Sequence, residues 1–513
     1  MADSRPNLLL IILDTLRRDR LSIYGNARPT SPHFDAFAAD HALFERAVAP
    51  AQWTIPAHGS LFTGLYPGAH GLTQANGTLN GLNPTLAEIL AASGYHTTAF
   101  CNNPLVGVLD NGLQRGFDHF FHYASAIPER PFNTTQSRLK RDFITWFRPY
   151  ARRIGNSFAH SDTLFRIALN PLFVPVWTRY INFKGHTSDS ISDLIAYWKQ
   201  HHAGGRERPL FSFVNLMGAH MPYQPPQDYV DKIAPELRRD KRAYQFIRRF
   251  NADGAGWASP REHPLDDWER HTLDAFYEAE IAYQDEQLGR LLDFLKTSGA
   301  LANTAVVIAA DHGELHGEHD FFGHGFSVHQ ELVHVPMTMH LPDLPAQRVG
   351  ATVSTRRLFH TFLDLAHATP PLDAADPNAD VRGLSLVDVL DHGTDGEGGS
   401  AFSEAVAPMT FVHVLEHRSP AVIAKLHLLD TRRTVYEGAF KLMMRGDQVE
   451  GLYDTAQDPD ELHNLAHDPA HAAQIAALKR RITPLIDGAA AHNGTAEVSD
   501  QVIDQLRALG YMD

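Results

Sequence analysis

The chain has 513 residues, of which 43% are hydrophobic and 20% charged, and its formal net charge is −15 at pH 7. This length allows two domains, or one large domain with a smaller one appended. The negative charge argues against a nucleic-acid partner, and the single cysteine, Cys101, excludes an intramolecular disulfide.

The first predicted element is a buried strand over residues 7–14, indicated by the apolar run in NLLLIILD. The run is too short to span a bilayer, and Asp3 precedes it where a signal peptide would carry a basic region. No other apolar run reaches the length of a transmembrane helix. We therefore expect a cytoplasmic protein without a transmembrane segment, which the single cysteine also allows.

Continuous apolar runs predict three further buried strands, and helical patterns lie between the strands. The predicted strands cover residues 95–102, 209–217 and 304–312, and the predicted helices cover 83–94 and 272–299. This alternation is typical of an α/β fold with a mostly parallel sheet, in which chemistry takes place at the carboxyl ends of the strands.

Residues 129–185 interrupt the pattern with an aromatic, basic stretch of ten Lys and Arg residues against three acidic ones. Its positive charge opposes that of the whole chain. We interpret it as an insertion that forms a lid or an oligomer interface, with peripheral membrane contact as the alternative, because basic aromatic helices bind anionic lipid.

The chain predicts a catalytic domain over residues 1–400 and a small α+β domain over 401–513. Residues 391–400 resemble a linker, 434–455 have a hairpin pattern, and a helical pattern follows.

Two acidic residues follow predicted strands directly. Asp14 ends the first strand, and Asp311 ends the strand at 304–312, with His312 beside it. Oxygen ligands together with one imidazole suit a divalent cation such as Mn²⁺ or Zn²⁺, and Mg²⁺ or Ca²⁺ less well. The pattern predicts a cation site at the edge of the sheet.

Several motifs, in order, resemble the sulfatase family of the alkaline phosphatase superfamily. These are NLLLIILDTLRRDRLSIYG, TIPAHGSLFTGLYPGAHG, ADHGELHGEHDFFGHGFSVHQELVHVPM, KLMMRGDQVEGLYDTAQDPDELHNLA and the tail QLRALGYMD. The resemblance covers nearly the whole chain except 129–185. It implies a large, mostly parallel central sheet flanked by helices, and a smaller C-terminal α+β subdomain with a short antiparallel sheet.

The resemblance also implies roles for individual residues. Asp14, Asp311 and His312 would bind one divalent metal, and Thr54 would act as the nucleophile that bridges metal and substrate. His220, in GAHMPY, would contact the anionic group of the substrate or its leaving oxygen.

Four positions depart from the family pattern. His58 stands in place of an arginine and His324 in place of a lysine. The paired acid after the first strand is Asp14–Thr15, and another lysine position offers neutral Asn102 or Asn103, which we assign to substrate binding together with His58.

The resemblance implies that a second metal, as in two-metal phosphatases of the superfamily, would need an Asp followed four residues later by a His, and Asp285 is the candidate Asp. Gly289 stands there instead, so we expect a single ion.

Thr54 decides which chemistry we expect. Sulfatases oxidise a cysteine or serine to formylglycine, but a threonine β-carbon already carries a methyl group and would give a ketone. Thr54 must therefore react as an alcohol, activated by a metal, and its ester must be cleared by a second in-line attack, a route familiar for phosphoryl groups.

We therefore expect a hydrolase of phosphate diesters or phosphonate monoesters that acts on a small anionic ester, with His220 or His324 protonating the leaving group. The alternatives are a sulfuric-ester hydrolase without formylglycine, a phosphotransferase, and a pseudoenzyme that only binds an anionic ligand.

Overall fold

The computed structural model describes residues 5–124, 128–132, 161, 163–164, 167, 172–174, 183–203, 208–258, 264–372 and 376–493. Within these residues, eight strands form a central sheet. Their order is β10 (Gln347–Ser354), β2 (Ala42–Val48), β9 (His334–His340), β6 (Thr304–Ala309), β1 (Asn7–Leu13), β5 (Leu210–Leu216), β3 (His96–Cys101) and β4 (His119–His122). Only β9 runs antiparallel to its neighbours, so the predicted mostly parallel sheet is confirmed.

The four predicted strands are β1, β3, β5 and β6, each within two residues of its expected bounds except at the end of β6. Every residue of these strands is buried. This burial on both faces explains their continuous apolar sequences, which do not alternate with polar residues.

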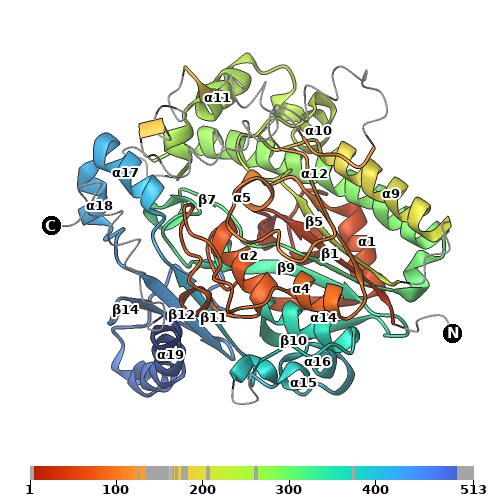
Figure 1. Cartoon of the computed structure of the whole chain (residues 1–513). Coiled ribbons are helices and arrows are strands. Elements are labelled where there is room, and N and C mark those ends of the chain that lie inside the picture. Colours follow the sequence, from red (N-terminus) through yellow and green to blue (C-terminus); the bar gives the residue numbers. More distant parts are fainter. Residues whose placement is uncertain are drawn as a thin grey trace, which may run out of the picture.

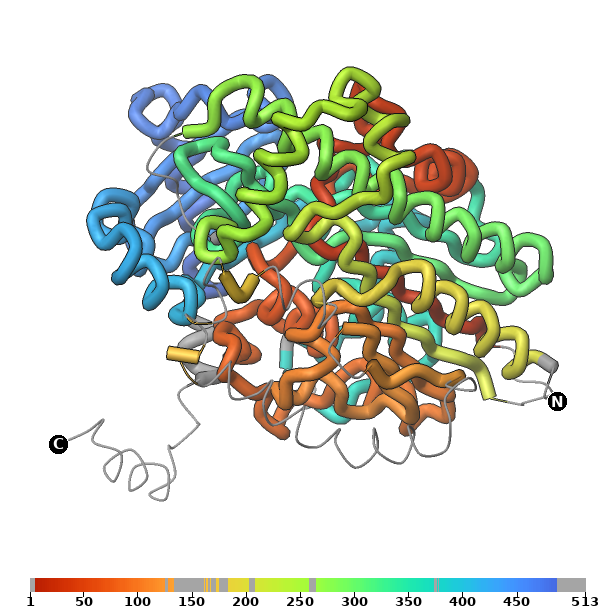
Figure 2. The backbone as a smooth tube through the Cα atoms, turned by 90° about the horizontal axis from the view of Figure 1, so that it is seen from above, coloured from red at the N-terminus to blue at the C-terminus, as the bar shows by residue number. Residues whose placement is uncertain are grey.

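Helices cover both faces of the sheet (Figure 1). One layer consists of α1 (Pro32–Asp40), α9 (Thr187–Ala203) and α12 (Asp267–Thr297), and the other of α2 (Thr54–Thr63), α4 (Leu86–Ala92) and α14 (Leu358–Leu365). Figure 2 shows α9 and α12 running side by side along their layer. The other α-helices of the described residues are α3 (Pro67–His70), α5 (Pro104–Gly107), α10 (Gln227–Ile233), α11 (Lys241–Ala252), α13 (Gln330–Val333), α15 (Val381–Leu384), α16 (Val387–His392), α17 (Met409–Arg418), α18 (Pro420–Lys425) and α19 (Ala472–Asn493).

The two predicted helices are α4 and α12, and both begin at a capping box. Thr85 and Glu88 cap α4 reciprocally, as Asp266 and Glu269 cap α12. The second box places the start of α12 five residues before the predicted one. Each box satisfies N–H groups that the first turn of a helix otherwise leaves without partners.

A second, four-stranded antiparallel sheet lies at the C-terminal end of the described chain, as expected. It consists of β11 (Ser400–Ala405), β12 (Arg432–Glu437), β13 (Phe440–Arg445) and β14 (Gln448–Asp454), and α19 packs against it. The amide of Glu404 donates to the carbonyl of Pro50 (3.0 Å), which joins this sheet to the segment that leads into Thr54. The domain boundary at residue 400 stays a prediction.

A short two-stranded sheet, β7 (Leu315–His316) with β8 (Phe322–Gly323), lies within the third motif. Most of the 129–185 insertion lies outside the described residues. None of the described helices combines the length and hydrophobicity needed to cross a membrane.

Candidate active site

Thr54 is the first residue of α2 and is 1% exposed. Its Oγ1 lies 3.3 Å from Nε2 of His312, and the amide nitrogen of Asn103 donates to it over 3.4 Å. His312 donates from Nδ1 to the carbonyl of Gly313 (2.9 Å), which leaves Nε2 with a lone pair toward Thr54. The positive end of the helix dipole also favours negative charge at this hydroxyl.

The structure brings Asp14, Asp311 and His312 together at the carboxyl ends of β1 and β6. Their candidate ligand atoms lie within 4.8 Å of one another, and all three residues are fully buried. Among the described residues, Oδ1 of Asp14 and Oδ2 of Asp311 have no hydrogen-bond partner. Burial and then the charge of Asp14 raise the pKa of Asp311 well above its usual value. Two buried carboxylates with unpartnered oxygens beside an imidazole lone pair fit a divalent cation.

Two amides hold the first carboxylate in place. Asn103 donates to Oδ2 of Asp14 over 2.6 Å, and Asn215 donates to the same oxygen over 3.1 Å. Sequence reasoning missed Asn215, although a polar residue inside the apolar strand β5 was a usable signal. The amide nitrogen of Asn102 instead donates to the carbonyl of Lys184 (3.1 Å), so the two predicted asparagines have different contacts.

His220 and His324 lie beside this group. The rings of His220 and His324 are 5.3 Å apart, and those of His324 and His312 are 4.6 Å apart. His220 donates from Nδ1 to the carbonyl of Met221, and His324 from Nδ1 to Glu314 Oε1 (2.9 Å), so Nε2 is the second nitrogen of each ring. Sequence reasoning missed Glu314, whose side chain is fully buried.

The two histidines differ electrostatically. Burial lowers the pKa of His220. Burial also opposes protonation of His324, but the Glu314 carboxylate outweighs it and raises the pKa of His324. His324 is therefore the ring that binds a proton more readily, and a protonated His220 is the stronger acid.

His58 lies one turn after Thr54 in α2 and is fully buried. It donates from Nδ1 to the carbonyl of Thr54 (2.9 Å), and its Nε2 lies 3.4 Å from the amide nitrogen of Asn215. Burial lowers its pKa, which favours a neutral ring. Both nitrogens therefore face the protein, and the predicted substrate contact of His58 stays a prediction.

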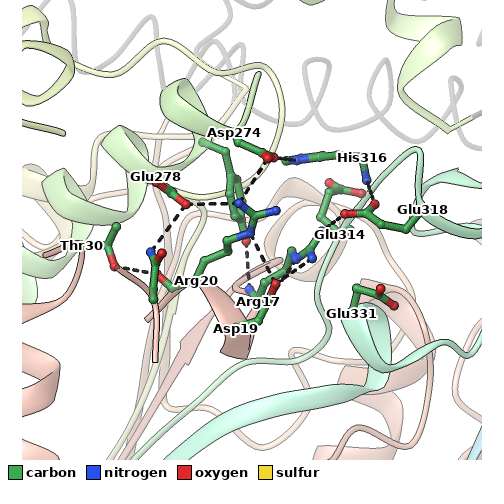
Figure 3. Close-up of polar contacts among 12 residues, drawn as sticks. Arg17, Asp19, Arg20, Thr30, Asp274, Glu278, Glu314, His316, Glu318 and Glu331 are labelled. Atoms are coloured by element: carbon green, nitrogen blue, oxygen red, sulfur yellow. Dashed lines mark hydrogen bonds and ion pairs between the residues drawn. The ribbon is translucent and has the colours of Figure 1, made fainter. Parts of the chain in front are cut away.

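A network of charged residues supports the loops that carry the candidate metal ligands (Figure 3). Arg17 is buried and donates to the carbonyl of Glu314 (3.0 Å), to Glu318 (2.8 Å) and through two nitrogens to Asp19. Burial alone would raise the pKa of Glu318, but Arg17 lowers it to about 2. Arg17 therefore connects the loop that follows β1 to the loop that follows β6.

The residues that depart from the family pattern have other contacts. The hydroxyl of Thr15 donates to the backbone carbonyl of Asp14 (2.7 Å) and not to a side chain of the candidate metal ligands. Asp285 accepts from the amides of His33 (2.9 Å) and Phe34 (2.8 Å) at the start of α1. A Cβ at Gly289 would lie 2.5 Å from the His33 ring, so α1 occupies the space of a side chain there.

A second cluster of possible ligands among the described residues is His319, His329 and Glu461. The two imidazoles stack at 3.8 Å with an interplanar angle of 3°. Lone pairs lie in the ring plane, so parallel stacked rings cannot both direct them at one ion. Lys441 Nζ also lies 2.6 Å from Glu461 Oε1. This cluster therefore fits a metal poorly.

Comparison with known proteins places the chain in a family. The profile of the family described as Sulfatase matches residues 6–368, and that of N-sulphoglucosamine sulphohydrolase, C-terminal, matches residues 317–487. An arylsulfatase of Clostridium perfringens (strain 13 / Type A) is 24% identical over 499 residues, which cover 94% of this chain and 95% of the relative.

Solved structures give the same fold. The phosphonate monoester hydrolase of Agrobacterium radiobacter is similar with a TM-score of 0.63 and 25% identity, covering 94% of this chain and 96% of that one. The phosphonate monoester hydrolase of Silicibacter pomeroyi has a TM-score of 0.63 and 20% identity, covering 94% and 95%. The chain is an ester hydrolase and belongs to the sulfatase family of the alkaline phosphatase superfamily, whose members use a divalent metal.

Proposed function

We propose that the protein hydrolyses phosphate diesters or phosphonate monoesters through a covalent intermediate on Thr54. The observation that carries this proposal is the position of the Thr54 hydroxyl, buried at the start of α2 against His312 and Asn103. A side chain at this position can reach both a cation and a substrate. Because threonine cannot yield the formylglycine aldehyde, the hydroxyl itself must attack.

A divalent cation, with Mn²⁺ or Zn²⁺ favoured, would be held by Asp14, Thr54, Asp311 and His312, and would supply the positive charge that lowers the pKa of the hydroxyl. The oxygen of Thr54, whose proton has passed to solvent, forms a bond to phosphorus while the bond from phosphorus to the leaving alcohol breaks. His220 or His324 gives that alcohol its proton from Nε2. Water then attacks phosphorus, returns a proton to the same histidine, and releases Thr54.

The charges around Thr54 favour a monoanionic substrate. Among the described residues, no lysine or arginine is hydrogen-bonded to Thr54, Asp14 or Asp311, and the amides of Asn103 and Asn215 supply neutral donors instead. A dianionic monoester would require more positive charge than a diester or a phosphonate monoester.

Sulfuric-ester hydrolysis without formylglycine is the second candidate. It is favoured by the arylsulfatase relative, which matches this chain over almost its whole length. A sulfate monoester is also monoanionic, so the charge argument does not separate the two reactions.

A substrate panel tests the proposal. Protein supplied with Mn²⁺ or Zn²⁺ is assayed with bis-p-nitrophenyl phosphate, p-nitrophenyl phenylphosphonate and p-nitrophenyl sulfate, with Thr54→Ala as the matched control. We expect the two phosphorus esters to react faster and the variant to be inactive. Sulfate turnover far above that of the phosphorus esters would reject the preference for phosphorus. Absence of turnover together with failure to bind either metal would support the pseudoenzyme.

A further inference from the structure

Lys184 lies near the end of the basic insertion but, unlike a surface lysine, its side chain is largely buried. Its side chain is only 16% exposed. The ammonium group donates to the carbonyl of Gly218 (2.7 Å), the carbonyl of Pro222 (3.0 Å) and Oε1 of Glu280 (3.0 Å). An ammonium group has three hydrogens, so all of them are used within the protein. Lys184 is therefore not available to bind a substrate.

The two carbonyls bracket His220, since each belongs to a residue two positions away from it. The same loop is fixed again at both ends by α12. The amide of Gly218 donates to Gln284 (2.6 Å), and the amide of Gln224 donates to Glu280 Oε1 (2.6 Å). Glu280 thus accepts from both the loop and Lys184, and the position of the His220 backbone depends on this pair.

The segment that carries Lys184 also reaches the end of β3. Its carbonyl accepts from Asn102 (3.1 Å), and a Cβ at Gly185 would lie 3.0 Å from the same amide. The Phe183 ring lies 5.9 Å from the His220 ring. Residues 183–185 therefore stand between the strand end that carries Asn102 and the loop that carries His220.

The energetics of a buried ion pair indicate that Lys184 and Glu280 position the His220 loop rather than add stability to the fold. Removing two charges from water costs about as much as their attraction returns, so such pairs often add little net stability. They do fix geometry, because a displaced partner would leave a buried charge unpaired. We therefore expect such a pair to hold the loop in place.

We propose that Lys184 and Glu280 are positioning residues for His220, so that proton transfer to the leaving group depends on the docked end of the 129–185 insertion. This inference rests on the role of His220 in the proposed function. The insertion thereby contributes to the active site through Lys184, which acts on the His220 loop and does not touch the substrate.

A double-mutant cycle tests this dependence with Lys184→Met, His220→Ala and the double variant. Lys184→Met should lower kcat about 10- to 100-fold with little change in KM, since it misplaces a proton donor. In the His220→Ala background the same substitution should change kcat less than about twofold, because the residue through which it acts is absent. Lys184→Arg should restore part of kcat.

Lys441→Met is the matched control, because Lys441 and Glu461 form a second buried pair, 2.6 Å apart. It should lower Tm without lowering kcat per folded molecule. Hydrogen exchange at residues 218–224 gives a readout that needs no substrate, and Lys184→Met should speed it while Lys441→Met should not. Glu280→Gln is the second variant if Lys184→Met fails to fold.

Equal losses of kcat in both backgrounds, or unchanged kcat with unchanged exchange, would overturn the inference. A failure of the proposed function would give results different from a failure of this inference. If the protein turns over aryl sulfate instead of phosphorus esters, the cycle is run with that ester. If it turns over no ester, unchanged exchange at 218–224 alone rejects the positioning role.

Discussion

Replacing Asp311 with asparagine should stabilise the metal-free protein. The ligand atoms of Asp14 and Asp311 lie within 4.8 Å, so two full charges repel by about 3.5 kcal/mol at an effective dielectric constant of about 20. The raised pKa of Asp311 means that part of this repulsion is already relieved by protonation. We therefore expect a gain of about 1–3 kcal/mol.

The asparagine side chain fits the same hydrogen bonds. Oδ1 of Asp311 accepts from the amides of Thr15 (3.3 Å) and His312 (2.9 Å), and an amide oxygen can replace it. Oδ2 lies 3.4 Å from Nε2 of His312, so an amide nitrogen there would face a lone pair.

With metal present, we expect the wild type to be more stable than Asp311→Asn. A ligand at about 100 times its Kd stabilises the folded wild type by about 2.7 kcal/mol, and Asp311→Asn should lose most of this gain. The assay is thermal unfolding with EDTA and with Mn²⁺. Asp285→Asn is the control: it removes an acceptor for the start of α1, and it should destabilise the protein in both conditions while the Mn²⁺ shift persists. If Asp311→Asn lowers Tm in EDTA, or keeps the full shift with Mn²⁺, the shared cation site is refuted.

Three further predictions concern the surroundings of this group. Asn103→Leu removes the amide that donates to Asp14 and Thr54, and should lower kcat/KM about 10- to 100-fold in steady-state assays; unchanged kcat/KM would exclude a role for that amide. Glu318 has a lowered pKa of about 2 against an ordinary 4.5, so its contribution to stability is present above pH 4.5 and is lost as pH falls toward 2. Between pH 6 and pH 3, Glu318→Gln should therefore lose about 2 kcal/mol less unfolding free energy in urea than the wild type, and equal losses would contradict the ion pair. His324→Ala should slow esters with poor leaving groups more than p-nitrophenyl esters, since a stable leaving anion needs less protonation, and equal slowing would argue against proton donation.

The sequence predicted those parts of the fold that depend on local pattern. Continuous apolar runs located β1, β3, β5 and β6, because strands buried on both faces contain few polar residues. Asp14 and Asp311 could be paired in advance because the carboxyl ends of parallel strands meet at one edge of a sheet.

The parts that escaped prediction depend on contacts between distant segments. Glu314 acquires its contact only when the chain folds His324 back onto it, ten residues later. Lys184 looked like one more surface cation, since nothing local to it indicates burial against α12 and the His220 loop. The early start of α12 was a missed local signal, because the Asp266–Glu269 capping box is visible in the sequence.

The role of Thr54 is tested most directly by rapid-quench mass spectrometry of the metal-loaded protein during turnover of bis-p-nitrophenyl phosphate. The account predicts a phosphoryl ester on Thr54 in the wild type, and neither adduct nor turnover in Thr54→Ala. Turnover in Thr54→Ala at more than about a tenth of the wild-type rate would contradict it, because a nucleophile cannot be removed at so small a cost.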